Sequence, residues 1–367
     1  MRNTILLSGL VALNCTLAGL GTHLSMDAGR SPSAVIPVTQ PVSRIEIWYG
    51  KSQKIGHLGE GQCDFNLLGN VRYPESIESL TYSLNGRPDV DLSYHSFRRL
   101  VEEGDFNADI PVNLLRRGPN VAVLHVRDRD GVAFKEEVTI ERLTGARPLP
   151  VHIDWSKVGD PQDVGQYVDG KWGLEKNGLR TLQIGYDRLF LIGDSDWEDY
   201  EVTVPVTINR IACTTGPFSG GNGLGIVLRF TGHVVGGPRH FPAAQPKWGY
   251  QPFGAIGLLR WVNGADYPPV LQFFPGDSDD SLDYKKFPIQ IGGTYVMRFR
   301  CRTLPDNTAS LGVSRYSFKI WPAETREPAA WDWVVTQASQ YALRRGAALL
   351  LAHHVDATFG NVTVVGE

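Results

Sequence analysis

Cysteine is scarce in this chain. Four cysteines are spread over 367 residues, and no two of them stand in a Cys-x-x-Cys pair. This spacing excludes a zinc knuckle and a dithiol redox motif. In an oxidising compartment Cys213 and Cys301 can pair within the C-terminal half, and buried free thiols are the alternative.

Long runs of one residue class are also missing. Lysine and arginine form no extended run, and the formal net charge is -3. Without a basic field the chain has no electrostatic footprint for nucleic acid or for an anionic membrane surface. After the first twenty residues no apolar run approaches the roughly 20 residues that span a bilayer. We therefore expect no nucleic-acid partner and no transmembrane segment beyond an export signal.

Several catalytic signatures do not occur. The chain has no serine nucleophile elbow, no phosphate-cradling glycine loop and no glucanase motif Glu-x-Asp-x-x-Glu. Asp194, Asp196 and Glu198 alternate as the two carboxylates of a retaining glycosidase would on a strand. Because Gly193 precedes them, a solvated acidic turn is the favoured interpretation.

One dense acidic segment suggests a metal. Calcium prefers hard oxygen ligands in a flexible loop, but the glycine and glutamate positions of an EF-hand are missing here. We expect a solvated loop and no cofactor, with calcium as the alternative. The acidic residues of this segment are Asp277, Asp279, Asp280 and Asp283.

The N-terminus has the features of an export signal. Arg2 supplies a positive start, and residues 5–20 are mostly apolar. We expect a signal peptide at 1–18 and a mature chain that is extracellular, periplasmic or in the cell envelope. A lipidated start at Cys15 is the alternative. Residues 19–43, rich in Ser, Pro and Ala, are expected to form a linker.

Short alternating runs fill residues 44–146. In residues 121–126 apolar and less apolar side chains alternate, and such runs end at Gly, Pro, Asn or Asp. With one short helical turn near Phe97 to Glu103, these strands fit an immunoglobulin-like β-sandwich. Pro148 and Pro150 stiffen the junction that follows, so we expect this domain to fold separately from the next.

Residues 151–367 form a second strand-rich unit. Tyr200 to Ile208 and Tyr295 to Cys301 each alternate apolar and polar side chains. A period of two over several segments indicates antiparallel sheets with one buried face. The single helix we expect covers Thr336 to Leu343.

Six segments of this unit follow one another in a recognisable order. They are Tyr-Val-Asp-Gly-Lys-Trp at 167–172, Asp-Ser-Asp-Trp-Glu-Asp-Tyr-Glu-Val at 194–202, Gly-Leu-Gly-Ile-Val-Leu-Arg-Phe at 223–230, Tyr-Val-Met-Arg-Phe at 295–299, Tyr-Ser-Phe-Lys-Ile-Trp at 316–321 and Phe-Gly-Asn-Val-Thr-Val at 359–364. This series resembles the concanavalin A-like lectin/glucanase fold, and within it the laminin-G-like and 3-keto-disaccharide hydrolase type domains. The resemblance implies an all-β protein whose C-terminal jelly roll meets saccharide on its concave face or its end loops.

A saccharide is recognised by flat apolar surface for its CH faces and by planar polar groups for its hydroxyls. The stretch from Arg229 to Trp261 is richest in both, although its Trp248 can equally cap the sandwich edge. Adjacent strand residues point to opposite faces, so one of His353 and His354 can face the groove and act there as a base. The predicted ligand-binding residues are Arg229, His233, Trp248, Tyr250, Arg260, Trp261, His353 and His354.

These observations favour a secreted or cell-envelope carbohydrate-binding protein whose partner is an extracellular polysaccharide or oligosaccharide. A glycoside hydrolase or polysaccharide lyase that uses the same concave face is the alternative. A non-catalytic adhesion module is a second alternative. An aromatic-lined groove would distinguish a carbohydrate-binding protein or an enzyme from an adhesion module. Two convergent titratable groups would distinguish an enzyme from a binding protein.

Overall fold

The computed structural model is almost wholly β, which confirms the predicted all-β class. In the part of the chain that it describes, no helix is long and apolar enough to cross a membrane. The helices there are the short 3-10 turns η1 Pro74–Ser76, η2 Val112–Leu114, η3 Trp155–Lys157 and η4 Pro161–Asp163. The expected signal peptide and linker lie outside the described residues. The described residues are 44–211, 221–234, 245–248, 253–262, 268–276, 281–305, 312–339 and 343–367.

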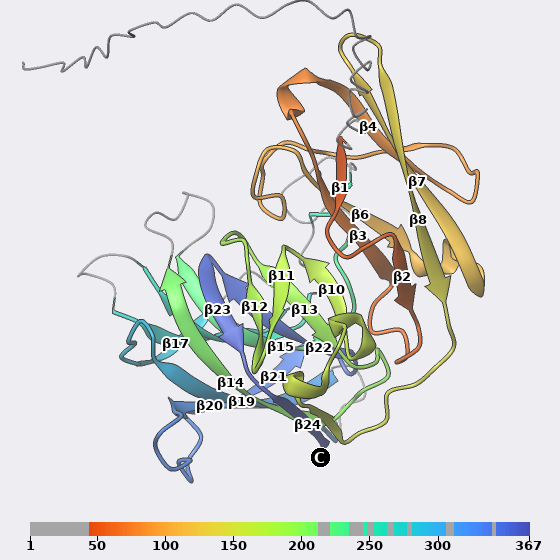
Figure 1. Cartoon of the computed structure of the whole chain (residues 1–367). Helices are drawn as coiled ribbons and strands as arrows, with labels where there is room; N and C mark the ends of the chain where they lie inside the picture. Colours follow the sequence, from red (N-terminus) through yellow and green to blue (C-terminus); the bar gives the residue numbers. More distant parts are fainter. Residues whose placement is uncertain are drawn as a thin grey trace, which may run out of the picture. The chain divides into compact units, whose positions relative to one another are not determined.

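A first sandwich is built from two sheets (Figure 1). One sheet has the strand order β1 (Ile45–Ile47), β3 (Asp64–Val71), β6 (Asp105–Pro111). The other has the order β2 (Ser52–Ile55), β8 (Ala133–Arg142), β7 (Gly118–Asp128), β4 (Ile77–Leu84), β5 (Val90–Asp91). On β7 the side chains of Ala122, Leu124 and Val126 are buried between the sheets, as the alternation predicted. An immunoglobulin-like topology stays a prediction.

A second sandwich follows, with a seven-stranded and a nine-stranded sheet (Figure 1). The seven-stranded order is β10 (Gln166–Asp169), β13 (Arg188–Ile192), β22 (Ala347–His353), β15 (Asn222–Phe230), β16 (Ala255–Trp261), β17 (Val270–Phe274), β18 (Leu282–Lys286). The nine-stranded sheet runs β11 (Trp172–Glu175), β12 (Gly178–Thr181), β23 (Val355–Phe359), β14 (Tyr200–Ile211), β19 (Thr294–Leu304), β20 (Gly312–Pro322), β21 (Trp333–Ser339). The strands β24 (Val362–Gly366) and β9 (Val151–Ile153) join it beside β14.

The seven-stranded sheet is apolar on both of its faces. On β15, Leu224 and Ile226 point into the core between the two sheets, whereas Val227 belongs to a separate buried cluster with Leu191 and Leu349. We call the face that carries this second cluster the front face. All nine residues of β15 are buried, as is typical of a strand covered on both sides.

The first sandwich contacts the strands at one end of the front face. The Asn107 side chain donates a hydrogen bond of 2.9 Å to the Val168 carbonyl oxygen. Gly61 approaches Leu191 so closely that no side chain would fit at position 61. Residues Ser43–Glu367 form one compact unit. The boundaries at 44–146 and 151–367, and separate folding of the two parts, stay predictions.

Two helical predictions are wrong. Residues 333–339, which include the start of the expected helix at Thr336, form the edge strand β21 and pair with β20. Backbone pairing along this sheet edge outweighs the local propensity on which the helix prediction was based. The turn expected near Phe97 to Glu103 is non-helical, because Phe97 and Leu100 form an isolated β-bridge instead.

The cysteine alternatives are settled in part. The Cys301 thiol is free and fully buried on β19, where it donates toward the Glu198 carbonyl oxygen at 3.4 Å. Burial raises the pKa of this thiol above its usual value. Cys213, its predicted partner, lies outside the described residues.

Candidate functional site

Arg229 lies near the end of β15 and is fully buried. Its guanidinium donates to the carbonyl oxygens of Glu198 at 3.1 Å and Leu343 at 2.7 Å. It also donates to the Ser314 hydroxyl at 2.7 Å and pairs with the Asp199 carboxylate at 2.9 Å. A guanidinium held in this way ties β15 to the chain around it. The geometry favours a structural role for Arg229 over the predicted contact with saccharide.

Three other predicted residues are also buried. His233 lies 3.0 Å from the carboxylate of Asp169 on β10. The Trp248 ring is 4% exposed and packs edge-on against Phe97 at 5.1 Å between centroids. Trp261 points into the core between the two sheets. Tyr250 lies outside the described residues. Trp248 therefore has the packing of a capping residue, which was the alternative interpretation of this side chain.

Arg260 and His353 are brought together by strand register. Gly223 on β15 pairs with Arg260 of β16 on one side and with His353 of β22 on the other. Residues that pair directly across strands share one face of the sheet. Both side chains are partly exposed. Gly223 lies between them, and the Leu258 side chain packs over it. These two predicted residues therefore share the front face at one end of the sheet.

His353 is held by a carboxylate that sequence reasoning missed. Its Nδ1 donates to Asp187 Oδ1 at 2.6 Å, and the two side chains are 14% and 13% exposed. Burial alone would raise the pKa of Asp187, but the charge and hydrogen bond of His353 hold it below its usual value. The carboxylate thus fixes the orientation of the imidazole.

Tyr186 completes this group. Its ring is T-shaped to His353 at 5.0 Å and to His354 at 6.3 Å. Burial, with the charge of His353 second, lowers the pKa of His354 to about 4, so this ring is neutral at pH 7. We call Tyr186, Asp187, His353 and His354 the front cluster.

The backbone of the front cluster is strained. Asp187 has a φ of 39° and His354 a φ of 56°, in the left-handed region that residues with a side chain rarely adopt. The His354 amide donates to the Gly185 carbonyl oxygen at 2.8 Å and so fixes the turn. Such outliers concentrate at functional sites, where the surrounding structure holds them in place.

A buried ionic network joins the two sandwiches near the front cluster. Arg99 of the first sandwich donates to Asp169 at 2.7 Å and to both oxygens of Asp109 at 2.9 Å. Burial would raise the pKa of Asp169, but Arg99 and His233 hold it below its usual value. Lys247 pairs with Asp64 at 2.7 Å. Each charge of this network is paired with an opposite charge, so we assign the network a structural role.

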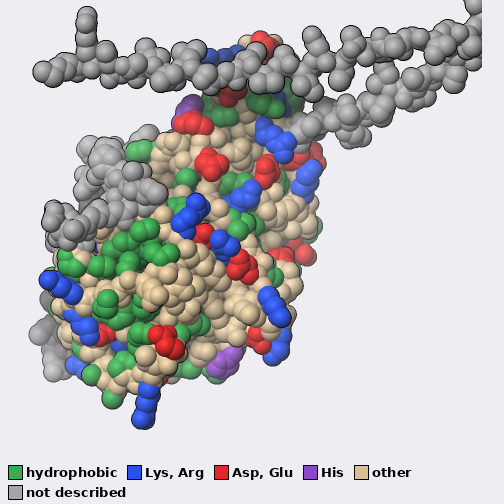
Figure 2. Space-filling model, turned by 60° about the vertical axis from the view of Figure 1, so that its left-hand side comes forward, with side chains coloured by type: hydrophobic (Ala, Val, Ile, Leu, Met, Phe, Trp, Pro, Cys, Tyr) green, Lys and Arg blue, Asp and Glu red, His purple; other side chains and the backbone are tan. Residues whose placement is uncertain are grey.

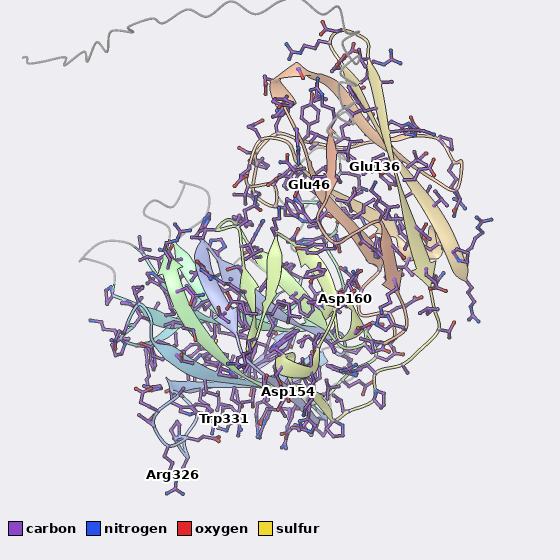
Figure 3. The ribbon with its side chains drawn as sticks, viewed as in Figure 1. Glu46, Glu136, Asp154, Asp160, Arg326 and Trp331 are labelled. Atoms are coloured by element: carbon purple, nitrogen blue, oxygen red, sulfur yellow. The ribbon has the colours of Figure 1, made fainter. Side chains whose placement is uncertain are left out.

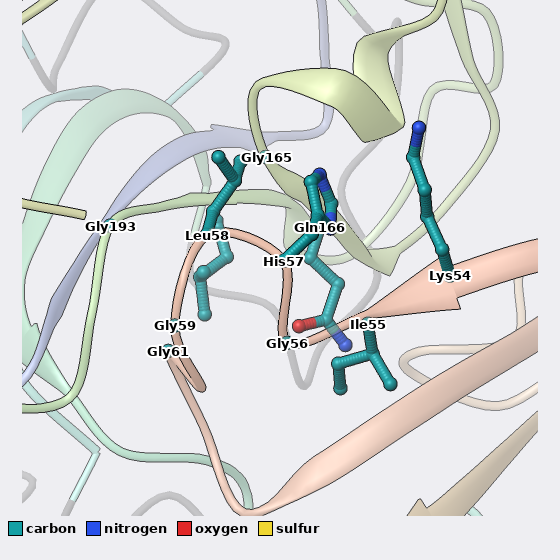
Figure 4. A pocket seen from close by; sticks show the side chains of 11 residues that line it. Lys54, Ile55, Gly56, His57, Leu58, Gly59, Gly61, Gly165, Gln166 and Gly193 are labelled. Atoms are coloured by element: carbon teal, nitrogen blue, oxygen red, sulfur yellow. The ribbon is translucent and has the colours of Figure 1, made fainter. Parts of the chain in front are cut away.

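A small cavity lies at the same junction (Figure 4). It holds about 20 Å³, which is room for about one water molecule and too little for a sugar ring. Burial, followed by the charge of Lys54, lowers the pKa of His57 in its wall. The lining residues are Lys54, Ile55, Gly56, His57, Leu58, Gly59, Gly61, Gly165, Gln166, Leu191 and Gly193.

The outer face of the nine-stranded sheet carries aromatic and charged groups as well. Trp331 lies in the loop between β20 and β21, which also carries Arg326 (Figure 3). The cations of Arg300 and Lys319 lie 4.7 and 4.8 Å from its ring centroid. Glu201 pairs with Arg300 at 2.6 Å. Two cations cover the Trp331 ring at these short distances, whereas one guanidinium lies 5.5 Å from the Tyr186 centroid, so this face suits sugar stacking less well than the front cluster.

Charged side chains of both signs are interspersed on the face that Figure 2 shows. The described residues contain no group of three His, Cys, Asp or Glu that could hold a metal. Asp277, Asp279 and Asp280 lie outside these residues and Asp283 lies on β18, so the expected solvated loop without a cofactor stays a prediction, and calcium stays its alternative. The acidic segment after Gly193 forms a turn, as expected, in which the Trp197 amide donates to the Asp194 carbonyl oxygen at 3.2 Å.

Comparisons with known proteins give distant similarities. No family and no curated protein matches the sequence. A solved structure of the VIP36 exoplasmic/lumenal domain, in a Ca²⁺/Man3GlcNAc-bound form, aligns at 10% identity and TM-score 0.35 over 59% of this chain and 91% of that one. Peanut lectin with a 9mer peptide aligns at 9% identity and TM-score 0.34, over 60% and 98%. The metal-free Emp46p carbohydrate recognition domain aligns at 10% identity and TM-score 0.33, over 58% of this chain and 94% of that one. At these scores the similarity carries no argument about the ligand of this chain.

Proposed function

We propose that this protein binds saccharide at the front cluster, as an exported or cell-envelope carbohydrate-binding protein. The observation that carries the proposal is the meeting of a partly exposed Tyr186 ring with the oriented His353–Asp187 pair on one face. The ring offers apolar surface for sugar CH groups, and the imidazole, carboxylate and nearby Arg260 offer planar partners for hydroxyls.

Glycan-array binding of the full chain tests this proposal. Tyr186→Ala removes the aromatic face, and we expect it to weaken saccharide binding by about 2 kcal/mol, or roughly 30-fold, as for a hot-spot aromatic. Tyr73→Ala is the matched control, because Tyr73 is an exposed tyrosine of the first sandwich beside Arg44. Equal binding by both variants would contradict the proposed site.

A second candidate is a hydrolase or lyase, which the 2.6 Å contact between His353 and Asp187 favours. A carboxylate that accepts the Nδ1–H leaves Nε2 as the basic nitrogen, as required of a general base. Product analysis on every array hit decides between the two candidates. An enzyme releases shorter or unsaturated sugars and loses this activity in His353→Gln, whereas a binding protein returns its ligand unchanged.

A further inference from the structure

A tight loop of the first sandwich lies beside the front cluster. Phe97 and Leu100 exchange backbone hydrogen bonds of 2.8 and 3.1 Å, and Arg98 at the tip has a φ of 50°. A residue with a side chain adopts this conformation rarely, and it persists where the surroundings impose it. The loop from Phe97 to Val101 is called the finger below.

The base of the finger is anchored in the second sandwich. Arg99, next to the tip, is buried and bonded to Asp169. The guanidinium of Arg188 donates to the Arg99 carbonyl oxygen at 2.9 Å. Val101 packs so closely on Gly185 that a side chain at position 185 would force Val101 to move. Since Gly185 and Arg188 enclose Tyr186 and Asp187 in sequence, the finger and the front cluster are held in one fixed relation.

The tip of the finger presents an aromatic and a guanidinium group next to Tyr186. Phe97 is 42% exposed, with the buried Trp248 packed behind it. The guanidinium carbon of Arg98 lies 5.6 Å from the Phe97 centroid and 5.5 Å from the Tyr186 centroid. The centroids of Phe97 and Tyr186 are therefore no farther apart than the sum of these two distances. A short oligosaccharide spans such a gap.

We propose that the finger forms a second saccharide subsite, in which Phe97 stacks on one sugar ring of the ligand. Arg98 donates hydrogen bonds to the groups that connect this sugar to the sugar ring bound at Tyr186. This inference rests on the proposed function and specifies its ligand as an oligosaccharide that contacts both sandwiches. Phe97 and Arg98 are then the residues that select for length. A planar guanidinium with several donors suits hydroxyl and carboxylate acceptors between two rings.

The test measures binding of the full chain to gluco- and manno-oligosaccharides of one to six residues by calorimetry. For Phe97→Ala and Arg98→Ala we expect a loss of about tenfold for trisaccharides and longer ligands, with little change for monosaccharides. Tyr186→Ala is expected to weaken all lengths alike. Tyr73→Ala and Arg87→Ala, at exposed positions elsewhere on the first sandwich, are the matched controls.

The outcomes separate the two proposals. If Tyr186→Ala weakens binding but the finger variants bind every length as the parent does, the second subsite is refuted and the proposed function stands. If the finger variants lose the same factor at every length, the finger does not select for length and the inference also fails. If the parent binds no glycan on the array and no member of either series, the proposed function is refuted and this inference with it. Thermal unfolding of each variant confirms that the loss occurs in folded protein.

Discussion

Replacement of Asp169 by asparagine should uncouple the junction between the two sandwiches. Asp169 accepts hydrogen bonds from Arg99 at 2.7 Å and Asn107 at 2.9 Å, and His233 lies 3.0 Å away. The variant leaves the buried Arg99 cation with Asp109 as its remaining carboxylate. Removal of one partner from a buried pair costs about 3 to 5 kcal/mol, because a buried charge loses its compensation.

We expect Asp169→Asn to lower the free energy of unfolding in urea by about this amount at pH 7. Tryptophan fluorescence follows unfolding, and one of the nine tryptophans, Trp172, lies at the junction, where its indole N–H donates to the Asp169 carbonyl oxygen at 2.8 Å. The folded pKa of Asp169 is depressed, so its contribution is present above the unfolded pKa and is lost as the pH falls through the folded value. The difference between variant and parent should therefore shrink in acid.

The exposed Asp130 provides the matched control, and Asp130→Asn should leave stability unchanged. A loss below about 1 kcal/mol for Asp169→Asn would refute the reasoning, because it would mean that the network does not hold the sandwiches together. A single cooperative transition in the parent and two in the variant would give the strongest support for coupling.

Three further predictions concern single residues. Arg229→Met should lower the melting temperature and leave saccharide affinity per folded molecule unchanged, because the Arg229 guanidinium is bonded within the protein. Trp248→Ala should cost about 3 to 5 kcal/mol of stability as a buried aromatic, measured by denaturant unfolding; a stable variant with weakened glycan binding would contradict this. Because the folded pKa of His354 is depressed to about 4 from an ordinary 6.5, stability should fall as the pH drops from 6.5 toward 4, and His354→Asn should flatten that part of a stability–pH curve.

The sequence predicted the sheets well because alternation is local. Tyr295, Met297 and Phe299 are buried on one face of β19, as a period of two requires. The edge strand β21 was mistaken for a helix, since its pairing with β20 comes from residues that precede it by about twenty positions. Local periodicity does not record which strands become neighbours.

The candidate site was only partly predictable. His353 and Arg260 were identified from residue type, but their places on one face, on either side of Gly223, depend on register between three strands. Asp187 was missed because 166 positions separate it from His353. Trp248 was expected at a ligand surface, and its burial depends on Phe97 of the other sandwich. Contacts between distant segments decide which polar and aromatic groups reach solvent.

The front face has a consequence for how this chain can be divided or reused. Leu191, Val227 and Leu349 form an apolar surface on the side of the sheet that faces away from its own core. A truncated protein that begins at residue 151 would lose the chain segments that pack on one end of this surface. Exposed apolar patches of that kind promote self-association. A fusion or display cassette should therefore carry residues 44–367 together, so that these packing segments are kept.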